Sequence, residues 1–395
     1  MKNIFKNNIF RRIKRIINYI NKKMLLIIDF WAIKENKKYR LNTLLLVRLD
    51  AIGDYILFRN FIEILKKSKK YCDYKITLCG NIIWKDLAEN FDKSFISKFV
   101  WIDKRKFIRN PIYRFKRLRY ISQYGFEIAI QPTYSREFFY GDVIIKASGA
   151  KARIGSEGDL SNITKRQKKI SDKYYTTLVP VKKENIFEFF RNKEFFEYIL
   201  GKKIKIDRPS INVNKKLNKL PIRNSYIVIF PGAGSKIRIW LPNKFAEVAD
   251  YVYKKYRYNI IIAGSKTDKI LAEDIKKKSK NLNIVDLTGR ITLSQLVQII
   301  KNANLLVSNE TAAVHIAAAV ETKTICISTG FHFGRFNPYP IKIFNKAFYV
   351  YPEIIQKRIY DYEYLMGKYR YAFPESTIDS IPVYKVKEAV DSFLQ

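Results

Sequence analysis

The feature that most constrains the fold is the regular alternation, from Leu44 onward, of short apolar runs with amphipathic stretches. The apolar runs have the length and β-branched content of buried strands, whereas the stretches between them repeat apolar residues at helical spacing. The predicted strands are Leu44–Leu49, Lys75–Leu78, Phe126–Ile130, Tyr226–Phe230, Asn259–Ala263, Leu305–Ser308 and Thr324–Ile327. The predicted helices include Tyr55–Lys66, Lys244–Lys254, Asp268–Lys278, Leu293–Ala303 and Thr311–Ala318. Strands that alternate with helices build parallel sheets covered on both faces, so the sequence predicts a doubly wound α/β fold.

The chain is too long for a single core, since its 395 residues exceed the roughly 250–300 residues at which one core stops growing. The alternation is interrupted between Gly201 and Arg223, where prolines and a run of Asn and Lys suit a connector. We therefore expect an extension of residues 1–40 and two Rossmann-like domains, residues 41–210 and residues 211–395, the second with a C-terminal helix. In such a pair the two domains face each other across a central cleft, with ligands beyond the carboxyl ends of the strands.

The net charge of +39 is spread along the chain, so charge alone does not indicate nucleic acid as a partner. The segment Met1–Arg40 stands out, because it has twelve Lys or Arg against only Asp29 and Glu35. Its apolar residues at helical spacing are Ile4, Phe5, Ile9, Phe10, Ile13, Ile16, Ile17 and Ile20. Such a segment either lies on an anionic membrane surface or forms a disordered or core-docked extension.

The three cysteines, Cys72, Cys79 and Cys326, lack the number and spacing of a disulfide framework or a zinc site. The apolar run from Met24 to Ile33 is too short for a membrane span and is interrupted by Asp29. We expect a cytoplasmic protein, with peripheral attachment to the inner leaflet of the cytoplasmic membrane left open by the basic segment.

The loop after the predicted strand Tyr226–Phe230 has the composition of a phosphate site. Gly232 permits close backbone approach, Ser235 supplies a hydroxyl, and Lys236 and Arg238 supply positive charge before a helix. This loop predicts a nucleotide-linked substrate.

Two further loops follow predicted strands. In the first, Gly53 precedes Asp54 at a strand-to-helix turn, where Asp54 is either a general base or a helix cap. In the second, Thr311 and His315 lie four residues apart at the start of a helix rich in alanine. This helix start either binds phosphate or packs closely against the sheet, with His315 as a packing residue.

The loops around Arg136 and His332 are less specific. Arg136 follows the predicted strand Phe126–Ile130, where it either meets an anionic acceptor or is a solvated surface residue. The loop Gly330–Phe336 combines aromatic residues with His332 and Arg335, which suits either stacking on a base or ordinary packing.

Taken together, the order and spacing of these loops resemble those of glycosyltransferase family 9, which includes the ADP-heptose lipopolysaccharide heptosyltransferases. The matching pieces are Leu45–Asp54, Phe230–Ser235 with Trp240–Pro242 and Phe245–Ala246, Asp286–Gly289, Ser308–Thr311 and His315–Ala319. Four weak motifs in family order form a more specific signal than any one of them.

The resemblance implies a GT-B architecture, with an N-terminal acceptor domain and a C-terminal domain for an ADP-linked sugar. It also implies metal-free, inverting transfer of a heptose-like sugar to lipopolysaccharide or another cell-surface glycan. By resemblance, Asp54 is the base beside Gly53 on the acceptor side, and Arg238 contacts the donor phosphates. The helix start maps onto Glu310, Thr311 and Ala312, with His315 beyond it.

This sequence departs from the family pattern at three of these positions, where the family usually has Lys for Arg238, Asp for Glu310 and Gly for Ala312. Arg keeps the charge and can bind phosphate with two hydrogen bonds. The absence of an Asp-x-Asp pair agrees with a metal-free site. A GT-B enzyme using a UDP- or GDP-sugar, a nucleotide-sugar epimerase and a non-catalytic basic binding protein are the alternatives.

Overall fold

The computed structural model describes residues 20–33, 38–181, 186–213, 225–281 and 283–395. It contains two parallel six-stranded sheets with helices around them. The chain divides into two compact units. Unit 1 contains the chain up to Asp50, Lys66–Lys85 and Ser94–Val181, whereas unit 2 contains Ala51–Leu65, Asp86–Lys93 and Lys182–Gln395. The expected domain limits at residues 40 and 210 remain predictions.

The sheet of unit 1 has the strand order β3-β2-β1-β4-β5-β6. Its strands are β1 (Arg40–Arg48), β2 (Lys75–Asn81), β3 (Lys98–Ile102), β4 (Phe126–Gln131), β5 (Ala152–Ser156) and β6 (Thr177–Val179). The central strand β1 pairs with β2 on one side, where Leu44 lies opposite Ile76, and with β4 on the other, where Leu44 lies opposite Ile128. One core of this unit joins β1 to α5 (Lys104–Arg109), α6 (Pro111–Tyr124) and α7 (Val143–Ser148).

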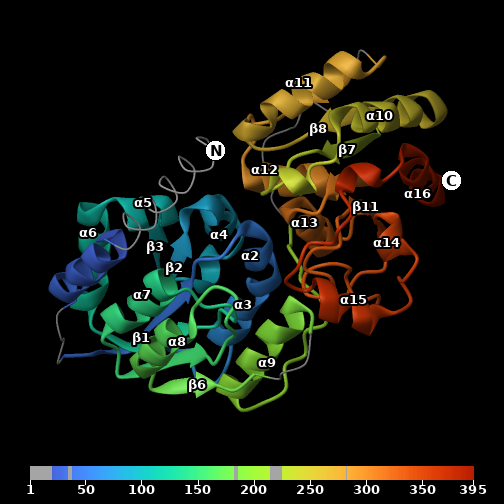
Figure 1. Ribbon diagram of the computed structural model, residues 1–395. Helices are drawn as coiled ribbons and strands as arrows, with labels where there is room; N and C mark the ends of the chain where they lie inside the picture. Colours follow the sequence, from blue (N-terminus) through green and yellow to red (C-terminus); the bar gives the residue numbers. More distant parts are fainter. Residues whose placement is uncertain (1–19, 34–37, 182–185, 214–224, 282) are drawn as a thin grey trace, which may run out of the picture. The chain divides into compact units, whose positions relative to one another are not determined.

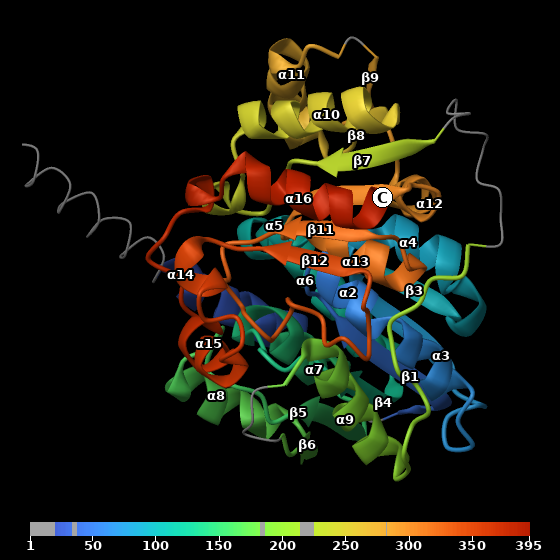
Figure 2. The same ribbon diagram turned by 90° about the vertical axis from the view of Figure 1, so that its right-hand side faces the viewer.

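The sheet of unit 2 repeats this topology, with the order β12-β11-β10-β7-β8-β9. Its strands are β7 (Tyr226–Phe230), β8 (Asn259–Ile262), β9 (Ile284–Asp286), β10 (Leu305–Asn309), β11 (Thr324–Ile327) and β12 (Ala347–Val350). The helices α10 (Pro242–Tyr256), α11 (Lys269–Lys278) and α16 (Val383–Leu394) share one core with this sheet. Figures 1 and 2 show α10 and α11 side by side, and α12 (Leu293–Lys301) next to α13 (Ala312–Val320). The order of the strands reverses between β10 and β7, so the carboxyl ends of these two strands form a topological switch point, the usual ligand position in such a sheet.

The predicted α/β class with parallel, doubly wound sheets is therefore confirmed. The strands Tyr226–Phe230 and Thr324–Ile327 have their predicted bounds, whereas β3, β5, β6, β9 and β12 were not predicted. The prediction of one helix over Tyr55–Lys66 is wrong: the chain forms α2 (Ile52–Phe58) and α3 (Asn60–Lys66). The turn lies at Arg59, whose guanidinium is directed to the buried Asp92, with 2.7 Å between Nη2 and Oδ1.

The other helices are α4 (Lys85–Phe91), α8 (Lys165–Ser171), α9 (Glu188–Leu200), α14 (Glu353–Gln356) and α15 (Tyr362–Tyr369). None of the helices within the described ranges has both the length and the hydropathy that a membrane span requires.

Residues 20–32 form a helix that docks on unit 1. Its Asp29 is buried and accepts two hydrogen bonds from Arg114 of α6, at 2.5 and 2.8 Å. Leu25 and Ala32 are buried beside it, so the described part of the basic segment packs on the protein. The predicted stripe from Ile4 to Ile17 lies outside the described residues.

Candidate active site

The carboxyl ends of β7 and β10 bring together two loops that lie far apart in the sequence. Asn309, the last residue of β10, is fully buried and connects them. Its side-chain amide donates a hydrogen bond to Pro231 O at 2.6 Å and accepts one from Trp240 N at 3.3 Å. Asn309 therefore holds the loop that carries Ser235 and Arg238 against the start of α13. Asn309 belongs to one of the matching motifs, but no sequence pattern indicates this positioning role.

Gly232 lies in this loop directly against Asp268. A Cβ at Gly232 would lie 2.4 Å from Cγ of Asp268, so a larger residue does not fit without movement. The Asp268 carboxylate is buried and accepts hydrogen bonds of 2.7 Å from both the backbone N and the hydroxyl of Ser265. Gly232 makes room for this carboxylate. The contact of Gly232 with a nucleotide-sugar donor stays a prediction.

Arg238 ends a short 3-10 turn, Lys236–Arg238, in which Lys236 is exposed. The Nε of Arg238 is buried and has no hydrogen-bond partner among the residues that the structure describes. Its positive charge acts on Glu310, which directly follows β10. Burial raises the pKa of the Glu310 carboxyl, and this rise is opposed by a 2.5 Å hydrogen bond from Ser328 and by the charge of Arg238. The loop is therefore a cationic site in which the Arg238 guanidinium has a donor that no described residue accepts.

Thr311 is the N-cap of α13, and its hydroxyl oxygen accepts a hydrogen bond from Ala313 N at 3.2 Å. Ala312 is the first residue of the helix. The start of α13 thus presents its free N–H groups at the carboxyl edge of the sheet, where they favour an anion. The sequence predicted this helix start correctly, whereas phosphate contacts by Thr311 and Ala312 stay predictions.

His315 lies one turn further along α13 and contacts α2. A Cβ at Gly53 would lie 2.5 Å from Cδ2 and 3.1 Å from Nε2 of His315, so only glycine allows this approach. The other ring nitrogen, Nδ1, lies 2.7 Å from the hydroxyl of Tyr339. Burial lowers the pKa of His315 to about 4, so the imidazole is neutral at physiological pH. The imidazole is thus a buried side chain that packs against Gly53, and its orientation is fixed by the hydrogen bond to Tyr339.

Asp54 is the third residue of α2 and half-buried. The N-cap of α2 is Ala51, so Asp54 is not the cap residue that one interpretation expected. In the first turn its negative charge is favoured by the helix macrodipole. Since Gly53 contacts His315, α2 brings Asp54 next to α13 within unit 2. Its role as a base stays a prediction.

Arg136 belongs to unit 1 and is 1% exposed, so the interpretation as a solvated surface arginine is wrong. It forms an ion pair with Asp172, lies 3.9 Å from Asp142 and stacks over the ring of Tyr175 at 4.8 Å. Its Nε and Nη1 are buried without a hydrogen-bond partner among the described residues. Its contact with an acceptor stays a prediction.

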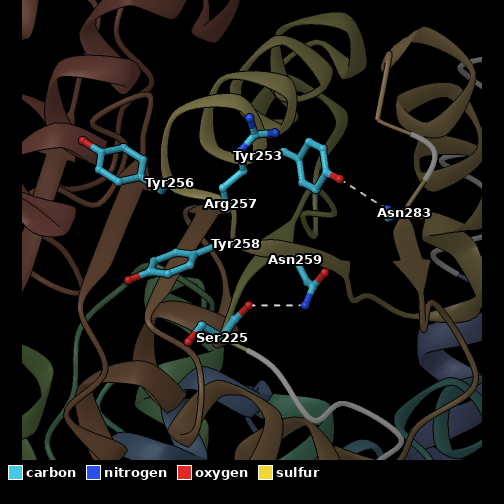
Figure 3. A pocket seen from close by; sticks show the side chains of 7 residues that line it. All are labelled: Ser225, Tyr253, Tyr256, Arg257, Tyr258, Asn259 and Asn283. Atoms are coloured by element: carbon cyan, nitrogen blue, oxygen red, sulfur yellow. Dashed lines mark hydrogen bonds between the residues drawn. The ribbon is translucent and has the colours of Figure 1, made fainter.

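A polar hollow of about 630 Å³ lies elsewhere in unit 2. Figure 3 shows that Tyr253, Tyr256, Tyr258 and Asn283 surround it, with Ser225 and Asn259 joined by a hydrogen bond below. These residues precede β7, β8 or β9, begin β8 or end α10, so the hollow lies at the amino ends of the strands. It is therefore at the opposite edge of the sheet from Arg238 and α13. In the part of the chain that the structure describes, no group of His, Cys, Asp and Glu side chains is arranged to hold a metal ion.

A doubly wound sheet with a cationic loop and a helix start at its switch point is typical of proteins that bind a phosphorylated ligand. The family model of glycosyltransferase family 9 (heptosyltransferase) matches residues 114–347, more than half of the chain, and the chain belongs to this family.

Known relatives agree with this assignment. Lipopolysaccharide heptosyltransferase 3 of Escherichia coli (strain K12) is 28% identical over 116 residues, which are 29% of this chain and 34% of that protein. The match thus spans about a third of the relative's length. The glycosyltransferase family 9 structure from Veillonella parvula superimposes with a TM-score of 0.69 at 16% identity, over 92% of this chain and 99% of that one. The E. coli heptosyltransferase WaaC with ADP-2-deoxy-2-fluoro heptose gives a TM-score of 0.65 at 12% identity, over 89% and 99%. These two structures share the fold.

Proposed function

We propose that this protein transfers a heptose-like sugar from an ADP-linked donor to a lipopolysaccharide or related cell-surface glycan acceptor. The observation that carries the proposal is the cationic site at the switch point of the unit 2 sheet, in a chain that belongs to family 9. There Arg238 has a buried Nε without a partner among the described residues, and the start of α13 lies at the end of the adjacent strand.

Each part of the site has a role in this reaction. The departing nucleoside diphosphate gains negative charge as the bond to the sugar breaks. Arg238, Lys236 and the free N–H groups of α13 stabilise that charge without a metal ion, and Ser235 adds a hydroxyl donor. Transfer is therefore metal-independent in this proposal, and Glu310 serves to orient Arg238.

Asp54 takes the proton of the acceptor hydroxyl as that oxygen attacks the anomeric carbon. The attack comes from the face opposite the diphosphate, so the configuration is inverted. His315 stays neutral, and its ring fixes the distance between α2 and α13 through Gly53. Asp54 is thereby held at a defined distance from the donor site, as general base catalysis requires.

The proposal is tested with a panel of nucleotides and nucleotide-sugars. We expect ADP and ADP-heptose to raise the melting temperature of the purified protein, and radiolabelled heptose to pass to a truncated lipopolysaccharide core. Stabilisation by UDP or GDP alone would assign another GT-B activity. A protein that binds none of these compounds, and binds anionic polymers with a steep salt dependence, would be a non-catalytic basic binding protein.

We also propose that the enzyme attaches peripherally to an anionic leaflet through the helix of residues 20–32. While one face of this helix docks through Asp29, its other residues are exposed: Ile27 is 60%, Phe30 74% and Trp31 69% accessible. The exposed Lys22 and Lys23 lie on the same helix. Apolar and aromatic side chains beside lysines suit the interface of an anionic membrane, where each cation contributes about 1 kcal/mol.

Vesicle co-sedimentation tests this attachment. We expect the protein to sediment with anionic vesicles at low salt and the double variant Phe30→Ser/Trp31→Ser to stay in solution. Ile341→Ser, at an 83% exposed site of unit 2, is the matched control and should sediment as the wild type does. Equal sedimentation of all three proteins would exclude this helix as the membrane contact. Deleting residues 1–40 is a poorer test, because it would leave the buried Arg114 without its carboxylate.

A further inference from the structure

The segment after β12 lies outside the part of the chain that the family model matches, which ends at residue 347. It contains α14 and α15 and forms a small core of its own. Ile355, Leu365, Met366 and Tyr369 from this segment pack around Phe333 of the loop 330–336. A Cβ at Gly334, where φ is +73°, would lie 2.5 Å from the sulfur of Met366, so the loop fits tightly on α15. The segment is thus built against the loop that follows β11.

This packing places Arg370 beside the loop 330–336, which is bonded through Ser328 to Glu310. His332 N donates a hydrogen bond to Tyr369 O at 2.9 Å, so the residue before Arg370 is bonded to the loop. Phe331 stacks on Phe373 with 3.8 Å between the ring centroids. The loop in turn is joined to Glu310, because Ser328 donates to that carboxylate at 2.5 Å and accepts from Gly330 N at 3.0 Å. These contacts connect the end of α15 to the site of Arg238.

Arg370 is a buried cation with an unused donor. Its side chain is 3% exposed, and its Nη1 has no hydrogen-bond partner in the described part of the chain. Its Nε donates to the hydroxyl of Tyr371 at 3.1 Å, and its guanidinium lies over that ring. The nearby Arg335 differs, because its Nε is 3.1 Å from the carboxylate of Glu188. As the C-cap of α15, Arg370 gains only the partial negative charge of the helix end.

The positive charges of this cluster act on His332. Burial and the positive charges of Arg335, Arg238 and Arg370 lower the pKa of His332 to about 3. Trp240, two residues after Arg238, donates its backbone N–H to Asn309 at 3.3 Å, directly before Glu310, so the loop of Arg238 is bonded to this group of loops as well. Two of these arginines, Arg238 and Arg370, have a buried nitrogen without a partner among the described residues. Keeping a cation such as Arg370 buried is costly unless an anion joins it.

We propose that Arg370 and Arg238 form a phosphoryl-binding subsite with the loop of His332, built by a segment that the family model does not match. Guanidinium groups bind phosphoryl oxygens through paired, charge-assisted hydrogen bonds. The group bound is the diphosphate of the nucleotide-sugar donor or a phosphate of the acceptor. If the bound group is the donor diphosphate, the inference rests on the proposed function. A phosphate of the acceptor would bind to the same two guanidinium groups by the same chemistry.

Calorimetric titration of the full-length protein with ADP and with inorganic pyrophosphate tests the subsite. We expect Arg370→Met, which keeps most of the apolar stem, to weaken both ligands about tenfold or more. Arg370→Lys should fall between Arg370→Met and the wild type. The matched control Arg358→Ala removes an exposed arginine from the same segment and should leave both affinities unchanged.

Melting temperature separates binding from a structural role. Removing an unpaired buried cation should leave the melting temperature of Arg370→Met equal to or above that of the wild type.

The source of the phosphate follows from the acceptor kinetics. If Arg370→Met binds ADP and pyrophosphate normally but has a raised KM for a phosphorylated acceptor and a normal KM for its dephosphorylated form, the acceptor supplies the phosphate. Unchanged binding and unchanged KM overturn the subsite. If Arg238→Ala weakens ADP while Arg370→Met changes nothing, the proposed function stands without this inference. If the wild type binds pyrophosphate but no nucleotide, the proposed function fails and the subsite stands.

Discussion

The contact between Gly53 and His315 yields a prediction about the stability of unit 2. In Gly53→Ala the new Cβ would lie 2.5 Å from Cδ2 of His315, well inside van der Waals contact. The imidazole cannot move away easily, because it is buried and its Nδ1 is held 2.7 Å from the hydroxyl of Tyr339. Helix α2 must therefore shift from α13. Overpacking of this kind costs about 1–3 kcal/mol.

The expected cost converts to a fall in melting temperature of about 2–12 °C, since 1 kcal/mol shifts a unit of about 150–250 residues by roughly 2–4 °C. Differential scanning fluorimetry measures this shift. Gly367→Ala is the matched control: it lies within α15, its Cβ would meet nothing within 4 Å, and alanine favours helix by up to about 1 kcal/mol.

A double-mutant cycle isolates the contact itself. In a His315→Ala background the space beside Gly53 is open, so Gly53→Ala should lower the melting temperature much less than it does in the wild type. If Gly53→Ala is as stable as Gly367→Ala, or if its effect is the same in both backgrounds, α2 does not pack on α13 through this contact.

Three further predictions concern the same site. Arg238→Ala should weaken ADP binding by about 1.5–3 kcal/mol in calorimetry, the scale of a charge-assisted hydrogen bond, and unchanged affinity would refute the donor contact. Because burial lowers the pKa of His315 to about 4, the unfolded state takes up a proton at higher pH than the folded state does. The contribution of His315 to stability should therefore be fully present above pH about 6.5 and fall by up to about 3 kcal/mol toward pH 4. Urea titrations of His315→Gln should show a correspondingly smaller fall than those of the wild type, in which His332 contributes as well. Added EDTA should leave the rate of sugar transfer unchanged, and a loss that Mg²⁺ restores would contradict metal-free stabilisation of the diphosphate.

The sequence predicted the fold class and several central strands because buried parallel strands are continuous apolar runs. Tyr226–Phe230 and Thr324–Ile327 are of this kind. The strands that were not predicted are short or lie toward the sheet edges, and their outward positions interrupt the pattern. In β12, for example, Phe348 is 43% exposed and only Val350 is buried.

The position of Gly53 and Asp54 at a strand-to-helix turn was predictable, because these residues are neighbours in the chain. The candidate site was not predictable where contacts cross the chain. Asp268 against Gly232 and Tyr339 against His315 depend on how loops pack, and no local pattern marks them. Arg370 lies in a segment without a motif, so only the structure connects it to His332.

In the proposed function, this chain catalyses sugar transfer with Asp54 as its base. The most direct test compares the wild type with Asp54→Asn in steady-state transfer from ADP-heptose to a lipopolysaccharide core acceptor, with ADP affinity measured in parallel. We predict a loss of kcat of about 10²–10⁴-fold with nearly unchanged ADP affinity, because an amide can bond the acceptor hydroxyl but cannot take its proton. A near-normal kcat for Asp54→Asn, with the wild type active on the same substrates, would contradict this mechanism.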